Sequence, residues 1–450
     1  MGGGIMPLIE DGILSAIQGR SGLISFHLTE EEGRAFIVAS IKSPADTREA
    51  ASLSYTQIAE VLSERGMAIL HERIFGSLSV ERDVMSARTQ AFTSFGISPD
   101  SPITYVEGNP PWGKGFAGVI IHAVKADAIW TVIDRGVPCG CGWKLNGETH
   151  LVLQNIQAFN SKPSDHTSKA HQARLMLENS ERILRENGAS YRDVVRTWFY
   201  LSDILGWYAA FNKVRNKKYG EFGIMPGSGN RELLLPASTG IEGNFSTGAA
   251  CAMDLIAVIG NNEDGRNTHL NTHLTISSRQ GRDNDHPSPV VGEGKGEGEH
   301  LITTRPSIKR LTNPSQVDAF RYGSAFARGS VIKNGSTDII EVSGTAAIDE
   351  HGVSLYPGDI RAQIDSTFHK VQHLLAQEDA GLENICAATV FVKKQEFAEI
   401  VYEMAAARGL EDFPCVCIVA DVCREELLFE IDAEAVVKTG ARDEKEGSRI

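Results

Sequence analysis

The distribution of hydrophobic and polar residues repeats three times along the chain. Each repeat holds the end of an amphipathic helix, a break with glycine, and a strand rich in β-branched and aromatic residues, in residues 58–79, 180–203 and 371–394. Such patterns are typical of a helix followed by a buried strand. A hairpin-like stretch precedes each repeat, at 22–42, 131–157 and 330–348. A helical run and then an apolar strand follow each repeat, the helical runs at 79–92, 204–219 and 395–409 and the strands at 116–124, 251–259 and 427–437.

The pattern therefore predicts the order β-β-α-β-α-β three times, an α+β fold with both helices on one face of each sheet. The opposite face must also be buried, because some strands are apolar at successive positions, as at Val390, Phe391 and Val392. Three sheets packed around a common axis would bury those faces, so we expect a pseudo-trimer within one chain. The alternative is three independent domains, but only one long linker is visible.

That linker divides the chain unevenly. Residues 260–299 hold almost no large apolar side chain after Ile276, so they cannot bury enough apolar surface to offset the entropy lost on ordering. The expected organisation is an N-terminal extension at 1–19, modules at 20–128, 129–261 and 303–440, a flexible acidic and glycine-rich linker at 262–302, and a polar tail at 441–450.

Composition narrows the class of protein. The 450 residues include 44 Lys and Arg against 58 Asp and Glu, a net charge of −14, which argues against a nucleic-acid partner. Apolar residues make up 42%, enough for a large core, but no apolar run reaches the length of a membrane span. The seven cysteines are expected to be reduced thiols, so we expect a cytoplasmic protein without a membrane partner.

The repeated motifs resemble those of the RidA/YjgF superfamily. In the middle module the resemblance rests on residues 193–203 and 235–243, and in the last module on residues 342–349, 357–368 and 427–437. The first module is similar only in pattern and is taken as degenerate. The resemblance implies a chorismate-mutase-like module that forms trimers, with active sites in the clefts between neighbouring subunits.

Within that superfamily the chain is most similar to the chorismatase branch, which also fuses modules in one chain. The similarity rests on NPSQVDAFRYGSAFARG at 313–329, SGTAAI at 343–348 and ADVCREELLFEID at 420–432. The chain departs from that pattern in its extra N-terminal module, its linker and a shorter FRYGSAF segment. These departures leave the substrate open.

Glu430 is the first candidate for chemistry. A carboxyl group within the apolar strand LLFEID would lose hydration, which raises its pKa toward neutrality and suits a general acid. The resemblance to chorismatases implies that this glutamate protonates an enolpyruvyl methylene, and the resemblance to RidA deaminases implies that it positions a water. The alternative is an edge-strand acid in solvent. The first module has Ile120 and His122 where we expect the acids Asp254 and Glu430, so its site is expected to be inactive.

Three cysteines lie near Glu430. The resemblance places Cys423 in the pocket wall, as a second catalytic candidate. Cys415, Cys417 and Cys423 share strand parity and could form a row, but they lack a fourth ligand, so we expect no metal site. RidA deaminases carry a substrate-binding arginine near the position of Cys415, which weakens the deaminase interpretation.

A carboxylate substrate needs a guanidinium partner, because a bidentate pair supplies both charge and orientation. The candidates are Arg231, Arg328 and Arg424, although any single arginine is more often part of a surface ion pair.

The turn at Ser343, Gly344 and Thr345 could hold a substrate oxygen with its backbone N–H groups, or it could be a β-bulge. Tyr322 is expected in the pocket wall, beside Phe326.

The sequence thus predicts a chorismatase-like enzyme that cleaves a small carboxylated enol ether, chorismate or a relative, by general-acid protonation and without metal or cofactor. A RidA-type imine or enamine deaminase is the first alternative, and a non-catalytic small-molecule binding protein is the second. The expected partner is a small carboxylated metabolite, and the expected state is a monomeric pseudo-trimer or a low-order oligomer.

Overall fold

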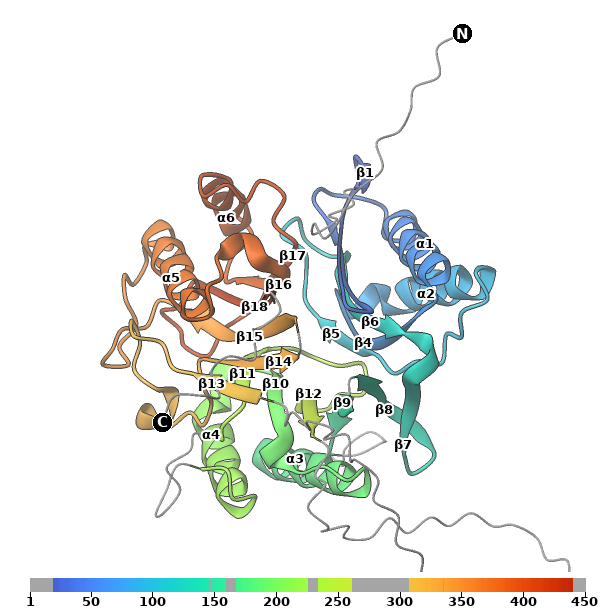
Figure 1. Ribbon diagram of the computed structural model, residues 1–450. Coiled ribbons are helices and arrows are strands. Elements are labelled where there is room, and N and C mark those ends of the chain that lie inside the picture. The colour runs from blue at the N-terminus through green and yellow to red at the C-terminus, as the bar shows by residue number, and fades with distance from the viewer. Residues whose placement is uncertain are drawn as a thin grey trace, which may run out of the picture.

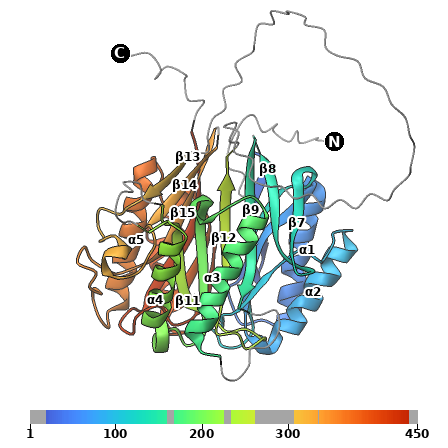
Figure 2. The same cartoon turned by 90° about the horizontal axis from the view of Figure 1, so that it is seen from below.

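A computed structural model describes residues 19–145, 147–158, 167–225, 234–260, 307–334 and 336–439. Its strands form three six-stranded sheets of mixed direction. Figure 1 shows the three sheets around a common axis with the helices on the outside, and Figure 2 shows the strands running roughly along that axis. Residues 1–18, the predicted 262–302 linker and the predicted 441–450 tail lie outside the described residues.

The three sheets share one strand order. The first is β1 (Gly19–Ser21), β2 (Ile24–Glu31), β3 (Arg34–Ile41), β6 (Phe116–Lys125), β4 (Met67–Gly76) and β5 (Thr104–Glu107). The second is β7 (Ile129–Asp134), β8 (Val137–Leu145), β9 (Glu148–Gln157), β12 (Cys251–Ile259), β10 (Val194–Leu201) and β11 (Ala237–Glu242). The third is β13 (Ser307–Leu311), β14 (Gly329–Asn334), β15 (Thr337–Ala346), β18 (Phe429–Lys438), β16 (Ile385–Val392) and β17 (Cys415–Val419).

Two long helices accompany each sheet. They are α1 (Thr47–Arg65) and α2 (Glu81–Ser94), then α3 (Lys169–Glu186) and α4 (Ile204–Glu221), then α5 (Ile360–Leu375) and α6 (Phe397–Ala406). The helix ends follow local chemistry. The Asp46 side chain accepts a hydrogen bond from the Glu49 N–H at the start of α1, and Gly66 ends that helix in the left-handed conformation.

The predicted α+β class and the three tandem modules are confirmed. Each six-stranded module contains two strands that the predicted four-strand order lacks. One is the antiparallel edge strand β1, β7 or β13. The other is a short parallel strand: β5 beside β4, β11 beside β10 and β17 beside β16. These parallel strands precede the closing strand and form one edge of each sheet. β5 and β11 are too short to show a clear pattern of alternation.

Burial explains why the modules form one body. Each sheet packs against its own helices through a separate apolar cluster. A fourth cluster lies between the inner faces of all three sheets and includes Phe75, Trp198 and Phe391, each at most 1% exposed. Independent domains could not share such a cluster, so the chain is an intrachain pseudo-trimer.

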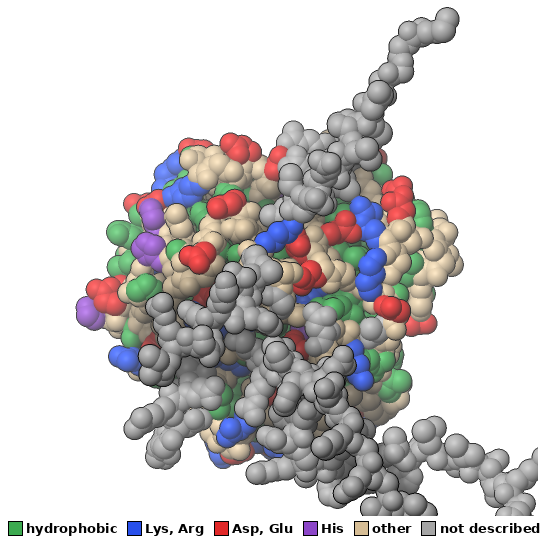
Figure 3. Space-filling view, viewed as in Figure 1, with side chains coloured by type: hydrophobic (Ala, Val, Ile, Leu, Met, Phe, Trp, Pro, Cys, Tyr) green, Lys and Arg blue, Asp and Glu red, His purple; other side chains and the backbone are tan. Residues whose placement is uncertain are grey.

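Figure 3 shows the surface of the molecule in the same view as Figure 1. Acidic and basic side chains are interspersed over the described part of this face. Among the described residues, no helix is both long and apolar enough to cross a membrane.

Candidate active site

A cavity of about 510 Å³ lies between the middle and third modules. The middle module contributes one face of α4 and the strand β11, and the third module contributes the segment before β14, the end of β15, the loop before β18 and β18 itself. The polar and aromatic side chains at its wall are those of Tyr208, Asn212, Lys213, Arg215, Asn216, Ser238, Tyr322, Ser324, Phe326, Arg328, Cys423, Arg424 and Glu430.

Glu430 is the acid of this cavity. It lies on β18 and is 4% exposed, and its carboxyl group makes no hydrogen bond or ion pair with a described residue. Burial raises its pKa to about 8, the nearby Asp432 adds to the shift, and Arg328 and Arg196 oppose it. At neutral pH the group is therefore a carboxylic acid that can donate a proton, as the sequence predicted.

Gly344 makes room for that carboxyl group. A Cβ at residue 344 would overlap Oε1 of Glu430, so any larger residue here would have to displace the carboxyl group from its present position. The backbone bulges here: Val342 pairs with Ala433, but Thr345 pairs with Ile431, which leaves one extra residue on β15. The bulge interpretation of this turn is thus correct.

The predicted hydrogen-bonding role of the turn is not supported. The N–H of Ser343 donates to the Arg328 carbonyl (3.1 Å), and the N–H of Gly344 donates to Thr239 Oγ1 (3.1 Å). The Ser343 hydroxyl donates to the Ala327 carbonyl, and the Thr345 hydroxyl donates to the Ser343 carbonyl. These groups are already satisfied within the protein, and Gly344 is the residue of the turn that lines the cavity.

Two of the predicted arginines reach the cavity. Arg328 donates to the Val317 carbonyl (2.6 Å) and to the Tyr322 hydroxyl (2.9 Å). Arg424 donates to the Gly352 carbonyl (2.8 Å), and its guanidinium lies over the Tyr322 ring. The third candidate, Arg231, lies outside the described residues.

A third guanidinium at the cavity, Arg215 on α4, was missed. It is 1% exposed, donates to Asn212 Oδ1 (2.6 Å), and its Nε has no hydrogen-bond partner among the described residues. The sequence does hold a signal for Arg215: Tyr208, Asn212 and Arg215 are spaced so that their polar groups lie on one face of a helix. Like Arg328 and Arg424, it forms no ion pair with a carboxylate of the described chain.

Cys423 lines the cavity in the loop between β17 and β18, so it is not in one strand row with Cys415 and Cys417. Those two thiols lie on β17 within the apolar core of the third module. Burial raises the pKa of Cys423 to about 12. Its sulfur is therefore a neutral thiol rather than a thiolate nucleophile. Tyr208 lies close to it, and burial raises the pKa of that phenol to about 12.

Strand register shows which clefts carry an acid. Besides a further register shift between Phe75 and Gly76 in the first sheet, the closing strand of each sheet pairs with the central strand through a β-bulge near the start of the central strand. Counted from that bulge, Ala252 in the second module and Gly118 in the first occupy the position of Glu430. Among the three modules, therefore, the third alone supplies a carboxyl group at this position.

The same register corrects the predicted equivalence of Asp254 and Glu430. Asp254 in the second module occupies the same strand position as Asp432 in the third, and Ile120 occupies this position in the first module. The cavity between the first and second modules is about 190 Å³ and is lined by the amides Gln154, Asn155, Gln157 and Asn179 among others.

The cleft between the first and third modules, called the third cleft, is closed at Gly118, the position that corresponds to Glu430. Space for a side chain at Gly118 is taken by Val416 and by the Ala39 carbonyl. This agrees with the prediction that the first module has no functional acid, although the matching residue is Gly118 rather than Ile120 or His122.

Comparisons with known proteins agree with this architecture. Residues 324–437 match the sequence profile of the family described as Endoribonuclease L-PSP. A crystal structure of chorismatase is similar over 82% of this chain and 92% of that chain, with 16% identity and a TM-score of 0.53.

Smaller solved structures match a part of this chain. The YjgF gene product of E. coli has 23% identity, 29% coverage of this chain, 99% coverage of that chain and a TM-score of 0.24. Yeast Mmf1 has 18% identity, covers 29% and 100% of the two chains and has a TM-score of 0.24. The third module, with its acid-bearing strand, thus matches the profile of the Endoribonuclease L-PSP (RidA/YjgF) family, and the whole chain has a tandem-module fold similar to that of chorismatase.

Proposed function

We propose that the chain cleaves a small carboxylated enol ether, with chorismate the leading candidate, in the cavity between the middle and third modules. The observation that carries this proposal is a buried carboxylic acid, Glu430, in a cavity that also holds three guanidinium groups. Among the described residues, neither Glu430 nor these guanidinium groups form an ion pair. A neutral acid beside cations is the arrangement needed to protonate an anionic substrate.

The reaction begins with proton transfer. Glu430 donates its proton to the methylene carbon of the enol ether, and the electron pair of the C=C bond forms the new C–H bond. The carbon attached to the ether oxygen then carries positive charge. Water adds to that carbon and returns a proton to the Glu430 carboxylate. The resulting hemiketal then breaks its bond to the former ether oxygen: the electron pair of the C–O bond stays on that oxygen, which takes up a proton, while the hemiketal hydroxyl gives up its proton and becomes the ketone of pyruvate. The products are pyruvate and an alcohol.

The cations bind and orient the substrate. Arg215 approaches the cavity from α4, whereas Arg328 and Arg424 approach from the third module. A substrate with two carboxylates can therefore be held from both sides. Bidentate guanidinium–carboxylate pairs fix direction as well as charge, so they place the methylene carbon against Glu430. The cavity volume of about 510 Å³ suits a molecule of this size.

The test is incubation of the full chain with chorismate and detection of the products by mass. We expect consumption of chorismate with release of one pyruvate, and its loss in Glu430→Gln. Glu425→Gln is the matched control, because Glu425 lies in the same segment with an exposed side chain. Ammonia release from a 2-imino acid in place of pyruvate would instead support the deaminase. Binding of chorismate without turnover at any pH would support the second alternative, a non-catalytic small-molecule binding protein.

A further inference from the structure

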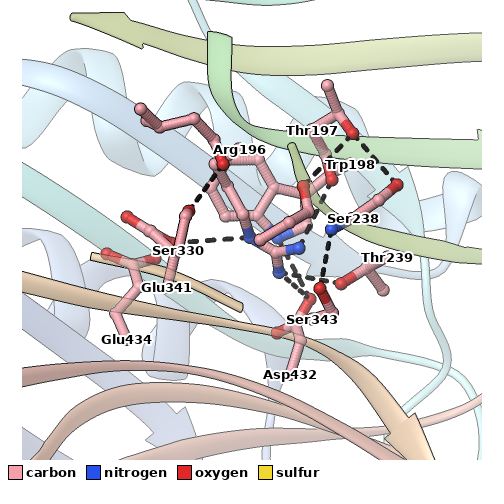
Figure 4. Close-up of polar contacts among 12 residues, drawn as sticks. Arg196, Thr197, Trp198, Ser238, Thr239, Ser330, Glu341, Ser343, Asp432 and Glu434 are labelled. Atoms are coloured by element: carbon pink, nitrogen blue, oxygen red, sulfur yellow. Dashed lines mark hydrogen bonds and ion pairs between the residues drawn. The ribbon is translucent and has the colours of Figure 1, made fainter. Parts of the chain in front are cut away.

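A second carboxylate lies on the same face of β18 as Glu430. Asp432 follows by two residues, and side chains at this spacing point to the same side of a strand. Asp432 is 1% exposed. Its Oδ2 accepts hydrogen bonds from Trp198 Nε1 (3.0 Å) and from Arg196 Nη2 (3.2 Å), both on β10 of the middle module (Figure 4). The neighbouring module thus holds Asp432 in place.

The same arginine reaches the wall of the cavity beside Glu430. Arg196 Nη2 donates to Thr239 Oγ1 (2.8 Å), and Thr239 Oγ1 accepts from the N–H of Gly344 (3.1 Å). Gly344 is the residue packed against the Glu430 carboxyl group. One continuous network therefore connects Asp432 to the backbone that shapes the site of the acid.

We propose that Asp432, held by Arg196 and Trp198 of the middle module, is a positioning residue whose fixed carboxylate disfavours ionisation of the Glu430 carboxyl group. This inference rests on the proposed role of Glu430 as the acid. A fixed negative charge close to a second carboxyl group disfavours ionisation of the latter, because like charges repel. Arg196 limits that effect by neutralising part of the Asp432 charge.

Other groups around Glu430 act on it as well. Burial raises the pKa of Glu430 and is the largest contribution, Asp432 raises it further, and Arg328 and Arg196 lower it. The remaining titratable or charged groups at the cavity are Tyr208, Lys213 and Arg215 of α4 and Tyr322, Cys423 and Arg424 of the third module.

The pseudo-threefold arrangement supplies a matched control. Asp254 holds the position of Asp432 in the second module and is also buried, with hydrogen bonds from Thr104 Oγ1 (2.6 Å) and the N–H of Asn155 (2.8 Å). The residue two positions before it is Ala252, so no carboxyl group stands at the position that Glu430 has relative to Asp432. If these aspartates serve only packing, substitution of either one should have the same effect. If Asp432 acts on Glu430, only substitution of Asp432 should change the ionisation of Glu430.

The experiment is an infrared titration of the carboxyl C=O band in the full chain. Each background is measured with and without Glu430→Gln, and the difference isolates Glu430 from Glu341, whose pKa burial raises to about 8 as well. We expect the Glu430 midpoint to fall by about one pH unit or more in Asp432→Asn. It should rise in Arg196→Gln, because this variant removes a positive charge that lowers the pKa of Glu430 and also removes the counter-charge of Asp432. It should stay unchanged in Asp254→Asn.

A Glu430 midpoint that does not move in Asp432→Asn, or that moves equally in Asp254→Asn, overturns the proposal. If Asp432→Asn does not fold, the double variant Asp432→Asn/Arg196→Gln, which removes both charges of the ion pair, is compared with Arg196→Gln alone. A lower Glu430 midpoint in the double variant supports the proposal, and equal midpoints overturn it. The titration needs no substrate, so it is separate from the test of function. Pyruvate release with an unmoved midpoint would refute only the role of Asp432, and the expected shifts without pyruvate release would refute only the enol-ether reaction.

Discussion

Gly344 and Glu430 come from neighbouring strands of one sheet, and the carboxyl group of Glu430 occupies the space that a side chain at residue 344 would need. The position of the Glu430 carboxyl group therefore depends on the glycine at residue 344. The bulge in β15 brings the backbone to this position, and the absence of a Cβ leaves room for Oε1 of Glu430.

Gly344→Ala should displace the Glu430 carboxyl group without removing it. We expect turnover to fall by about 100-fold or more, because general-acid catalysis depends on the position of the proton donor. The measurement is kcat with the preferred enol ether. Gly220→Ala is the control, since nothing lies within 4 Å of a Cβ built there. Unchanged turnover in Gly344→Ala would show that the acid does not need its present position.

Glu430→Gln should make the protein more stable while it abolishes turnover. The pKa of Glu430 rises from 4.5 in the unfolded chain to about 8 in the folded protein. Between these values the unfolded chain has lost the proton and the folded protein keeps it, so wild-type stability falls as pH rises. Glu430→Gln carries an amide that does not ionise, so its stability does not fall with pH for this reason.

The stability difference between Glu430→Gln and the wild type should therefore be absent near pH 4, grow from pH 5 to 8 and level off above pH 8, at about 1 kcal/mol or more. Denaturant unfolding at several pH values measures it. A difference that shrinks as pH rises would mean that the folded protein prefers the ionised carboxylate.

Arg215→Gln should weaken substrate binding. Its buried guanidinium forms no ion pair with a carboxylate in the described part of the chain and is available to the substrate, so we expect KM to rise by about tenfold or more while folding is retained. Steady-state kinetics and a thermal melt provide both readouts. Arg361→Gln is the control, because that arginine is 54% exposed and forms a surface ion pair with Glu403. Equal effects in both variants would exclude a specific role for Arg215.

Cys423→Ser should keep most of the activity. With a pKa of about 12 the sulfur carries its proton at neutral pH, so a covalent role is not expected. We expect a change in kcat of less than about tenfold and some change in the ratio of products, because the side chain lines the cavity. A complete loss of turnover with normal binding would indicate that the thiol reacts directly.

One chain should bind one substrate molecule. Glu430 has Ala252 and Gly118 as its equivalents, and Val416 fills the space at Gly118. Calorimetric titration of Glu430→Gln with the substrate should give a stoichiometry of one per chain. A stoichiometry of two or three would mean that the cavity between the first and second modules, or the third cleft, also accepts it.

Much of the third module's share of the site could be predicted from sequence. Glu430 interrupts an apolar strand, and the motif order placed Cys423, Arg328 and Tyr322 around it, all of which line the cavity. These residues lie within one module, and family resemblance reaches them directly.

The other half of the site could not be predicted in the same way. Arg215 and Tyr208 belong to the middle module, and which helix face meets the third module depends on how the sheets pack around the axis. The equivalence of Asp254 with Asp432 depends on β-bulges, which shift the register by one residue and have no clear sequence signal. The satisfied N–H groups of Ser343 and Gly344 likewise depend on contacts far along the chain.

Cleavage of the enol ether in D₂O tests the central claim most directly. If Glu430 protonates the methylene carbon, the transferred proton comes from solvent, and pyruvate forms with one deuterium in its methyl group. The pyruvate is trapped at once as lactate, so that later exchange does not add label. The account predicts one deuterium per lactate methyl group in wild type and no product in Glu430→Gln. Lactate without methyl deuterium, or an undiminished rate in Glu430→Gln, would contradict it.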